Sequence, residues 1–194
     1  MLVLVSGSPR RADLLAQLGH KFRILRPQVD EMLKAQESAM EAVSRLAIDK
    51  VRWGQLMLSD EQGSSEKVLI GADTLVEYNG QILGKPDDRQ QAKQMLLMLS
   101  GKTHKVVTGV AVCKGEIIID CVVETLVTFR RLTTGEAEAY WQTGEPIDKA
   151  GGYAIQGKGA VFVASISGSY TNVVGLPLME TAELLGQMGV PAFA

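Results

Sequence analysis

The segment Val68–Tyr78 constrains the fold most, because it is a long apolar run of β-type residues interrupted by Asp73 and Thr74. The Asn-Gly dipeptide at 79–80 is a strong hairpin signal, and Gln81–Leu83 is typical of the returning strand. An ionised aspartate in a buried strand is costly unless it is paired or metal-bound. Asp73 is therefore the strongest single candidate for chemistry. The alternative is a β-bulge in which Asp73 and Thr74 bond local backbone.

The chain opens with a strand, a Ser/Gly loop and a helix start. Leu2–Val5 is a short β-type run, Ser8 is suited to the helix N-cap and Pro9 to the first helical position. Such a helix start presents backbone N–H groups to an anion. Arg10 and Arg11 oppose the helix dipole there, so they are poorly placed for stability and well placed to bind a phosphate.

A lysine on the inward face of a helix is the next unusual feature. The capping box at 38–41 starts a helix that we expect to run to about Gln55, with Val43, Leu46 and Ala47 on its apolar stripe. At the helical period, Lys50 lies about 20° from Val43, near the middle of that stripe. Either the lysine stem runs along the core, or the ammonium group points into a cleft and meets an anion.

The remaining elements follow from periodicity and turn signals. We expect a helix at 88–99, strands at 105–112 and 116–128 joined by a Lys114-Gly115 turn, a helix capped at Thr133, a strand at 160–166 and a helix from Pro177 to about Met188. The turn at Lys114-Gly115 would not place the two cysteines opposite each other, so we expect free thiols. These patterns predict an α/β or α+β fold, and the length of 194 residues is that of one ordinary domain.

Composition excludes several functional classes. The 20 Lys+Arg and 22 Asp+Glu residues give a net charge of -2, and aromatic residues make up only 5%, so we expect no nucleic-acid partner. No apolar run is long enough to cross a membrane, and the N-terminus lacks the features of an export signal. These observations predict a cytoplasmic protein with no membrane partner.

Several common active-site motifs are missing. The sequence has no P-loop, the Gly157-Lys-Gly159 run lacks Rossmann spacing, and with only His20 and His104 a zinc site or a Ser-His-Asp triad is unsupported. The remaining candidates are carboxylates and cations near element ends. Asp30 and Glu31 alone could be a solvated acidic turn, and Lys85 a plain strand exit. Together with Lys50 and Asp73 they favour phosphoryl or nucleotidyl chemistry with Mg²⁺ or Mn²⁺.

A set of short motifs along nearly the whole chain carries a specific resemblance. In order, they are Ser6-Gly-Ser-Pro-Arg-Arg11, Val29-Asp-Glu31, Arg45-Leu-Ala with Lys50, Gly71-Ala-Asp-Thr74, Gly84-Lys-Pro86, Ser100-Gly101 with Thr108-Gly109, Asp148-Lys-Ala-Gly151 and Asn172-Val-Val-Gly-Leu-Pro177. The chain resembles the Maf family of nucleoside triphosphate pyrophosphatases. Tyr153 and Ile155-Gln-Gly157 resemble the branch that acts on dTTP and UTP.

The resemblance implies roles for individual residues. Asp73 matches the family's proposed proton acceptor, and Glu31 with Asp73 would hold a divalent metal, Mg²⁺ or Mn²⁺. The positions that match substrate-binding or specificity residues are Ser8, Arg10, Arg11, Lys50, Thr74, Lys85 and Gln156. The implied reaction is water attack on the α phosphorus of the nucleotide, which releases the monophosphate and pyrophosphate. Alternatives are a 7-methyl-GTP or CTP pyrophosphatase, and a non-catalytic regulator of septum formation.

The resemblance also implies a fold. The family is similar to the inosine triphosphate pyrophosphatases, with an elongated α/β architecture, a mixed twisted sheet flanked by helices, and a central cleft. We therefore expect one Maf-like domain over residues 1–194, with two lobes around the cleft. Members are often dimeric, so the resemblance implies a homodimer.

Overall fold

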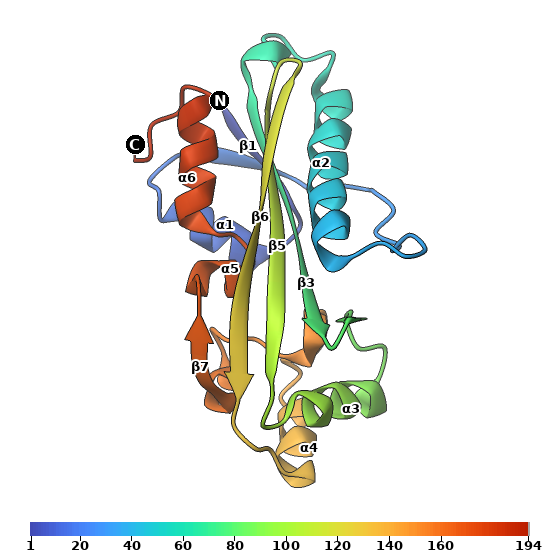
Figure 1. Cartoon of the computed structure of the whole chain (residues 1–194). Helices are drawn as coiled ribbons and strands as arrows, with labels where there is room; N and C mark the ends of the chain where they lie inside the picture. Colours follow the sequence, from blue (N-terminus) through green and yellow to red (C-terminus); the bar gives the residue numbers. More distant parts are fainter. Residues whose placement is uncertain (194) are drawn as a thin grey trace. The chain divides into compact units, whose positions relative to one another are not determined.

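The computed structural model describes residues 1–193 and has a mixed α/β fold (Figure 1). Within these residues a seven-stranded sheet has the order β2-β1-β3-β5-β6-β7, with β4 paired to β3. Pairing with β1 is parallel for both β2 and β3, whereas the β3–β4 and β6–β7 pairs are antiparallel. The strands are β1 Leu2–Val5, β2 Phe22–Leu25, β3 Val68–Tyr78, β4 Gln81–Leu83, β5 Thr103–Lys114, β6 Ile117–Phe129 and β7 Val163–Ser167. This mixed sheet confirms the α/β class.

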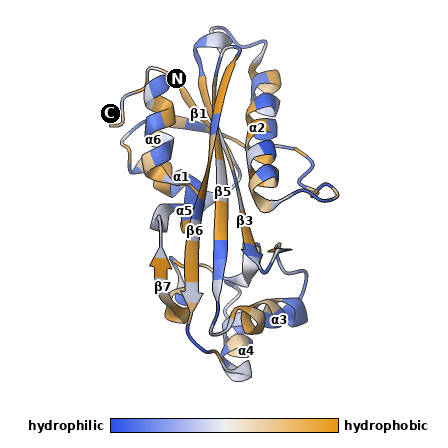
Figure 2. Cartoon of the chain, in the orientation of Figure 1, coloured by the Kyte–Doolittle hydropathy of each residue, from blue (hydrophilic) through white to orange (hydrophobic). Residues whose placement is uncertain are grey.

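Helices α1 to α4 lie between strands in the sequence, and α5 and α6 follow β7. The α-helices are α1 Pro9–Ala16, α2 Ala39–Leu58, α3 Arg89–Leu99, α4 Thr134–Gln142, α5 Tyr170–Val174 and α6 Leu178–Gln187. Short 3-10 helices are η1 Ser64–Glu66, η2 Ala150–Gly152 and η3 Lys158–Phe162. Apolar and polar segments alternate along α2 and α6, which is typical of helices that pack on one side only (Figure 2).

The chain divides into two units, and β3, β5 and β6 contribute residues to both. The first unit contains residues 1–73, 108–123 and 175–194, and the second contains residues 74–107 and 124–174. Each unit has its own buried residues. The expectation of one domain over the whole chain stays a prediction.

Close packing of α2 on the sheet organises the first unit. The helix begins with the predicted capping box, in which Ser38 and Glu41 bond each other's backbone N–H. A Cβ atom added at Gly71 would lie 2.6 Å from the carbonyl oxygen of Ala47, and one at Gly109 would lie 2.8 Å from the Ser44 nitrogen. Only glycine at these two strand positions allows the backbone of α2 to approach the sheet this closely.

An aromatic cluster organises the second unit. Phe129 packs edge-on against Tyr153, with ring centroids 4.7 Å apart, and Tyr140 packs in the same way against Phe162 at 4.9 Å. The His104 ring stacks edge-on against Phe129 at 4.9 Å. Such edge-to-face pairs stabilise a core beyond the area that they bury. The cluster ties β5, β6, α4 and the glycine-rich segment after α4 into one core.

The structure corrects several element boundaries. Residues 160–162 belong to η3 rather than to the predicted strand at 160–166, so β7 starts only at Val163. The β5–β6 turn is at 115–116 rather than Lys114-Gly115, with Gly115 at a φ of +57°. A positive φ suits glycine, and this sets the position of the turn. Two short elements, β2 and α5, were not predicted.

Cys113 and Cys121 are free, as predicted, and burial raises the pKa of each thiol to about 11. Both are therefore unreactive as nucleophiles at neutral pH.

Within residues 1–193, no helix combines the length and the apolar character that a membrane span requires.

Candidate active site

Lys50 and Asp73 form a buried ion pair in the first unit. Lys50 lies on the inward face of α2, only 3% exposed, and Asp73 lies in β3, 8% exposed. The Lys50 Nζ atom is 2.5 Å from Asp73 Oδ1 and also donates to the Ala72 carbonyl at 3.4 Å. The inward direction predicted for Lys50 is confirmed. The pairing supplies the charge partner that an ionised aspartate in a buried strand requires.

A second carboxylate meets the same ammonium group. Glu31, in the loop between β2 and α2, has its Oε1 atom 2.8 Å from Lys50 Nζ. Its side chain is 47% exposed, whereas that of Asp73 is 12% exposed. Two acidic residues separated by more than forty positions in the sequence therefore bind one lysine. The Asp73 carboxylate is buried, and the Glu31 carboxylate is open to solvent.

Arg11 brings a further positive charge to these carboxylates. Its Nε atom donates to the Gly175 carbonyl at 2.7 Å, and its Nη1 atom donates to Ser6 Oγ at 3.4 Å. Burial lowers the pKa of Arg11, while the charges of Asp73 and Glu31 oppose that change. An arginine stays protonated under all ordinary conditions. In the first turn of α1, the positive charge of Arg11 is therefore fixed by hydrogen bonds and interacts with Asp73 and Glu31.

Ser8 lies at the N-cap position of α1, as predicted, and Pro9 is the first helical residue. Its side chain makes no capping hydrogen bond, and its own N–H group donates to Ser6 Oγ at 3.2 Å. Arg10 lies beside Arg11 and contributes to the charge that Arg11 experiences. The helix therefore begins with a serine hydroxyl that the helix itself does not use as a cap, next to two arginines.

Comparison with known proteins assigns the chain to a family. The family model described as "Maf-like protein" matches residues 1–188. The chain belongs to the Maf family. It is 52% identical over 185 residues to the dTTP/UTP pyrophosphatase of Vibrio cholerae, covering 95% of this chain and 96% of the relative. It is 50% and 48% identical over 184 residues to proteins with the same name from Escherichia coli and Salmonella typhimurium, covering 95% of this chain and 91% of each relative.

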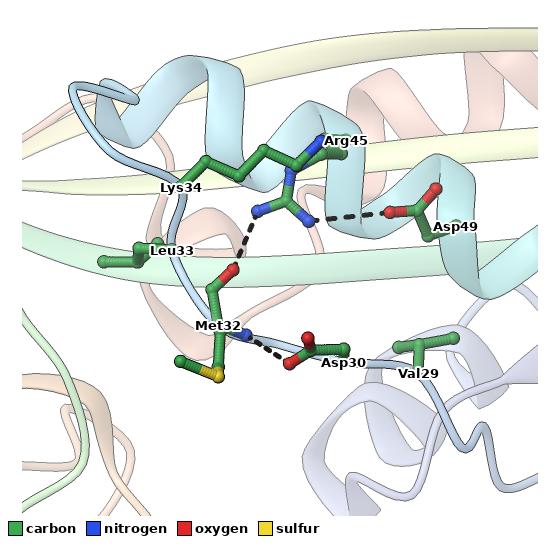
Figure 3. Close-up of a pocket in the computed structure, with 7 residues that line it drawn as sticks. All are labelled: Val29, Asp30, Met32, Leu33, Lys34, Arg45 and Asp49. Carbon is green, nitrogen blue, oxygen red and sulfur yellow. Dashed lines mark hydrogen bonds and ion pairs between the residues drawn. The ribbon is translucent and has the colours of Figure 1, made fainter.

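An arginine network supports the loop that carries Glu31 in this Maf protein. Arg45, on α2, donates to the Glu37 carboxylate from Nε at 2.5 Å and from Nη2 at 2.7 Å. Its Nη2 atom also donates to the Met32 carbonyl at 3.2 Å, and Met32 N–H donates to Asp30 Oδ1 at 3.0 Å (Figure 3). The two residues that flank Glu31 are thus each held by a hydrogen bond.

The same residues line a pocket of about 510 Å³, formed by Val29, Asp30, Met32, Leu33, Lys34, Arg45 and Asp49 (Figure 3). Arg45 stands within one of the motifs that carry the family resemblance, but no role was predicted for Arg45 or for Glu37. The spacing of Arg45 and Asp49, an i,i+4 pair at 3.6 Å, is the one local signal in the sequence. The contact with Glu37 joins a loop residue to a helix residue, so no periodic pattern in the sequence indicates it.

Three of the predicted substrate residues belong to the second unit of this Maf protein. Thr74 follows Asp73 in β3, Lys85 follows β4, and Gln156 lies in the glycine-rich segment between η2 and η3. Gln156 is exposed, although the five residues before it are buried. Their roles stay predictions. The structure does bring Arg11, Glu31, Lys50 and Asp73 together within the first unit.

Proposed function

We propose that this chain hydrolyses dTTP and UTP to the nucleoside monophosphate and pyrophosphate. The observation that carries the proposal is the convergence of Asp73 and Glu31 on Lys50, with Arg11 held beside them. The relatives that are about half identical over nearly the whole chain bear the name dTTP/UTP pyrophosphatase. A phosphoanhydride substrate needs both features: carboxylates to handle a proton and a metal, and cations to bind phosphate oxygens.

Asp73 is the residue that we assign to the proton. A carboxylate held by an ion pair on one oxygen can accept a proton from water on its other oxygen. Lys50 fixes the direction of that carboxylate through the 2.5 Å contact. The water that Asp73 deprotonates would attack the α phosphorus, and pyrophosphate would leave with the electrons of the broken P–O bond.

Glu31 and Asp73 are the residues that would hold a divalent cation, for which we propose Mg²⁺ or Mn²⁺. Their oxygens lie 2.8 Å and 2.5 Å from the same nitrogen, so both can reach a common point. Among residues 1–193 no group of three or more His, Cys, Asp or Glu side chains could hold a metal ion. A pair of carboxylates completed by phosphate oxygens and water is a donor set that suits Mg²⁺. When bound, such a cation neutralises phosphate charge and lowers the pKa of the attacking water.

The cations and the helix start would bind the triphosphate. Arg10, Arg11 and Lys85 would donate charge-assisted hydrogen bonds that strengthen as the leaving group gains charge. The Ser8 hydroxyl at the N-terminus of α1 would contact a phosphate oxygen. Gln156 offers both a donor and an acceptor to a pyrimidine edge, with Thr74 as a second contact to the substrate.

Location and assembly are part of the same proposal. We propose that the enzyme acts in the cytoplasm, where nucleoside triphosphates are made and used, and that it forms a homodimer. Sedimentation velocity across a range of protein concentrations would test the dimer. A species with the mass of a single 20.9 kDa chain at all concentrations would contradict it.

The test of the function is a comparison of nucleotides in water labelled with ¹⁸O. The protein is incubated with dTTP, UTP, CTP, 7-methyl-GTP and ATP, with and without Mg²⁺, and pyrophosphate and orthophosphate are assayed separately. We expect metal-dependent pyrophosphate release from dTTP and UTP, with the label in the monophosphate. Preference for CTP or 7-methyl-GTP would contradict the substrate assignment, and no release from any nucleotide would contradict the enzyme assignment.

A further inference from the structure

The glycine-rich segment at 153–159 of the second unit has one strongly held side and one open side. Tyr153, Ala154 and Ile155 are 6%, 5% and 8% exposed, and Gly159 is buried. Gln156, between them, is exposed. Gly157 is half-buried and Lys158 is exposed, so the side chain proposed to contact the base lies between the buried residues 153–155 and the buried Gly159.

Glu145, in the loop after α4, accepts hydrogen bonds from three groups in this part of the chain. Its Oε1 atom accepts from the Tyr140 hydroxyl at 2.6 Å and from Gly159 N–H at 2.9 Å, and its Oε2 atom accepts from Lys158 N–H at 2.9 Å. The Tyr140 oxygen in turn accepts from Ala154 N–H at 3.1 Å. Tyr140 and Glu145 together thus hold backbone groups on both sides of Gln156.

The two glycines of the Gly157-Lys-Gly159 run make this arrangement sterically feasible. A Cβ atom at position 157 would lie 2.6 Å from Glu145 Cδ, and one at position 159 would lie 2.7 Å from Tyr140 Oη. Both distances are shorter than van der Waals contact allows. The run, which has no place in a dinucleotide motif, is therefore explained by the space that the Tyr140 and Glu145 side chains occupy.

The protonation states suit this pattern of donors and acceptors. Burial alone would raise the pKa of Glu145, but hydrogen bonds from Tyr140, Gly159 and Lys158 outweigh it, and the pKa lies below its ordinary value. Burial and the hydrogen bond to Glu145 raise the pKa of Tyr140. Glu145 is thus an acceptor and Tyr140 a donor at neutral pH.

A second anchor holds the start of the segment. The Tyr153 hydroxyl and His104 Nε2 are 2.8 Å apart, and both rings pack on Phe129. Burial lowers the pKa of His104 to about 4, so the ring is neutral under ordinary conditions. This anchor stabilises the core side, whereas the Tyr140–Glu145 pair holds the N–H groups of Ala154, Lys158 and Gly159.

We propose that Tyr140 and Glu145 are positioning residues for nucleotide specificity, because they fix the backbone on both sides of Gln156 and so the point at which its amide meets the base. The inference rests on the proposed function, since it requires Gln156 to contact a pyrimidine. A displaced amide would lose the distinction between UTP, which offers a carbonyl at C4, and CTP, which offers an amino group there.

The experiment uses Glu145→Gln and Tyr140→Phe in the full chain. All three groups around Glu145 are donors, so an amide NH₂ in place of one oxygen must face a backbone N–H or the tyrosine hydroxyl. We expect the ratio of kcat/KM for UTP to that for CTP to fall about tenfold in Glu145→Gln. Amide hydrogen exchange at Lys158 and Gly159 would become faster. Tyr140→Phe gives the same direction of change and retains the ring.

Glu138→Gln is the matched control, because Glu138 lies on α4 with Tyr140 and binds Arg89 and Gln142 instead of the 153–159 segment. Simple destabilisation lowers the active fraction for both nucleotides equally, so Glu138→Gln should leave the ratio unchanged. In a Gln156→Ala background, Glu145→Gln should add nothing further to the loss of discrimination. Faster exchange with a wild-type ratio, or an undiminished effect in the Gln156→Ala background, would overturn this inference alone. Wild-type protein without UTP hydrolysis would overturn the proposed function together with it.

Discussion

The ion pair between Lys50 and Asp73 shows how far individual residues could be interpreted from sequence. Lys50 was predicted on the inward face because its angular position follows from the helical period, and Asp73 was singled out because a charge in a buried strand needs a partner. That each residue supplies the other's partner could not be predicted, since the contact depends on how α2 packs on β3. From its own position Glu31 was a candidate only as part of an acidic pair, because loops carry no periodicity, and its role as a metal ligand came from the family resemblance.

Removal of the charge on Lys50 should destabilise the protein and abolish activity. Lys50→Met retains the stem but leaves Asp73, with 12% of its side chain exposed, without its 2.5 Å partner. We expect a loss of about 3 kcal/mol in the free energy of unfolding, measured by denaturant titration. The double variant Lys50→Met/Asp73→Asn should regain much of that stability and remain inactive. A single variant as stable as wild type would contradict the pairing.

The Arg45–Glu37 contact should give the protein a defined acid sensitivity. Hydrogen bonds from Arg45 and from the Lys34 N–H lower the pKa of Glu37 from 4.5 to about 2. A lowered pKa contributes stability that is complete above the unfolded value and is lost as the pH falls through the folded value. The difference in Tm between wild type and Glu37→Gln should therefore be constant from pH 7 to about 5 and shrink between about 4.5 and 2. A difference independent of pH across that window would show that the charge on Glu37 has no role.

Elements with strong local signals were predicted well, and those set by tertiary packing were not. The capping boxes of α2 and α4 and the Asn-Gly turn after β3 lie where the sequence predicts them. The parallel strand β2 is only four residues long and exposes Arg23 and Ile24 in succession, so it lacks the alternation that marks a half-buried strand and was missed. The apolar run at 160–162 was taken for a strand, but it forms η3, which leads the chain from the glycine-rich segment into β7.

Close contact between α2 and the sheet should be sensitive to a single methyl group. Gly71→Ala would place a Cβ atom 2.6 Å from the Ala47 carbonyl and 3.2 Å from Lys50 Cβ, so α2 must shift and carry Lys50 with it. We expect lower thermal stability and at least a tenfold loss of kcat, since small misplacements in an active site are costly. Gly186→Ala in α6 is the control, because it meets nothing within 4 Å and should stabilise the helix by up to about 1 kcal/mol. Wild-type kcat in Gly71→Ala would contradict the packing argument.

At the scale of the whole molecule, the fold brings distant parts of the chain to one group of charges. The residues around Lys50 come from the loop before α2, from β3 and, through Arg11 and its contact with Gly175, from α1 and the segment before α6. Within the second unit, Tyr140, Glu145 and the 153–159 segment show the same use of distant residues. Short motifs marked many of these positions, but only the fold shows which of them touch.

The most direct test of the account is the turnover of dTTP by Asp73→Asn in the presence of Mg²⁺. Asparagine retains the shape of the side chain and a hydrogen-bond acceptor for Lys50, but it cannot take a proton from water at neutral pH. We predict a fall in kcat of about 10³-fold or more for pyrophosphate release, the loss of general-base catalysis together with a metal ligand, with circular dichroism showing an intact fold. A folded Asp73→Asn variant with wild-type turnover would contradict the assignment of Asp73 as the catalytic residue.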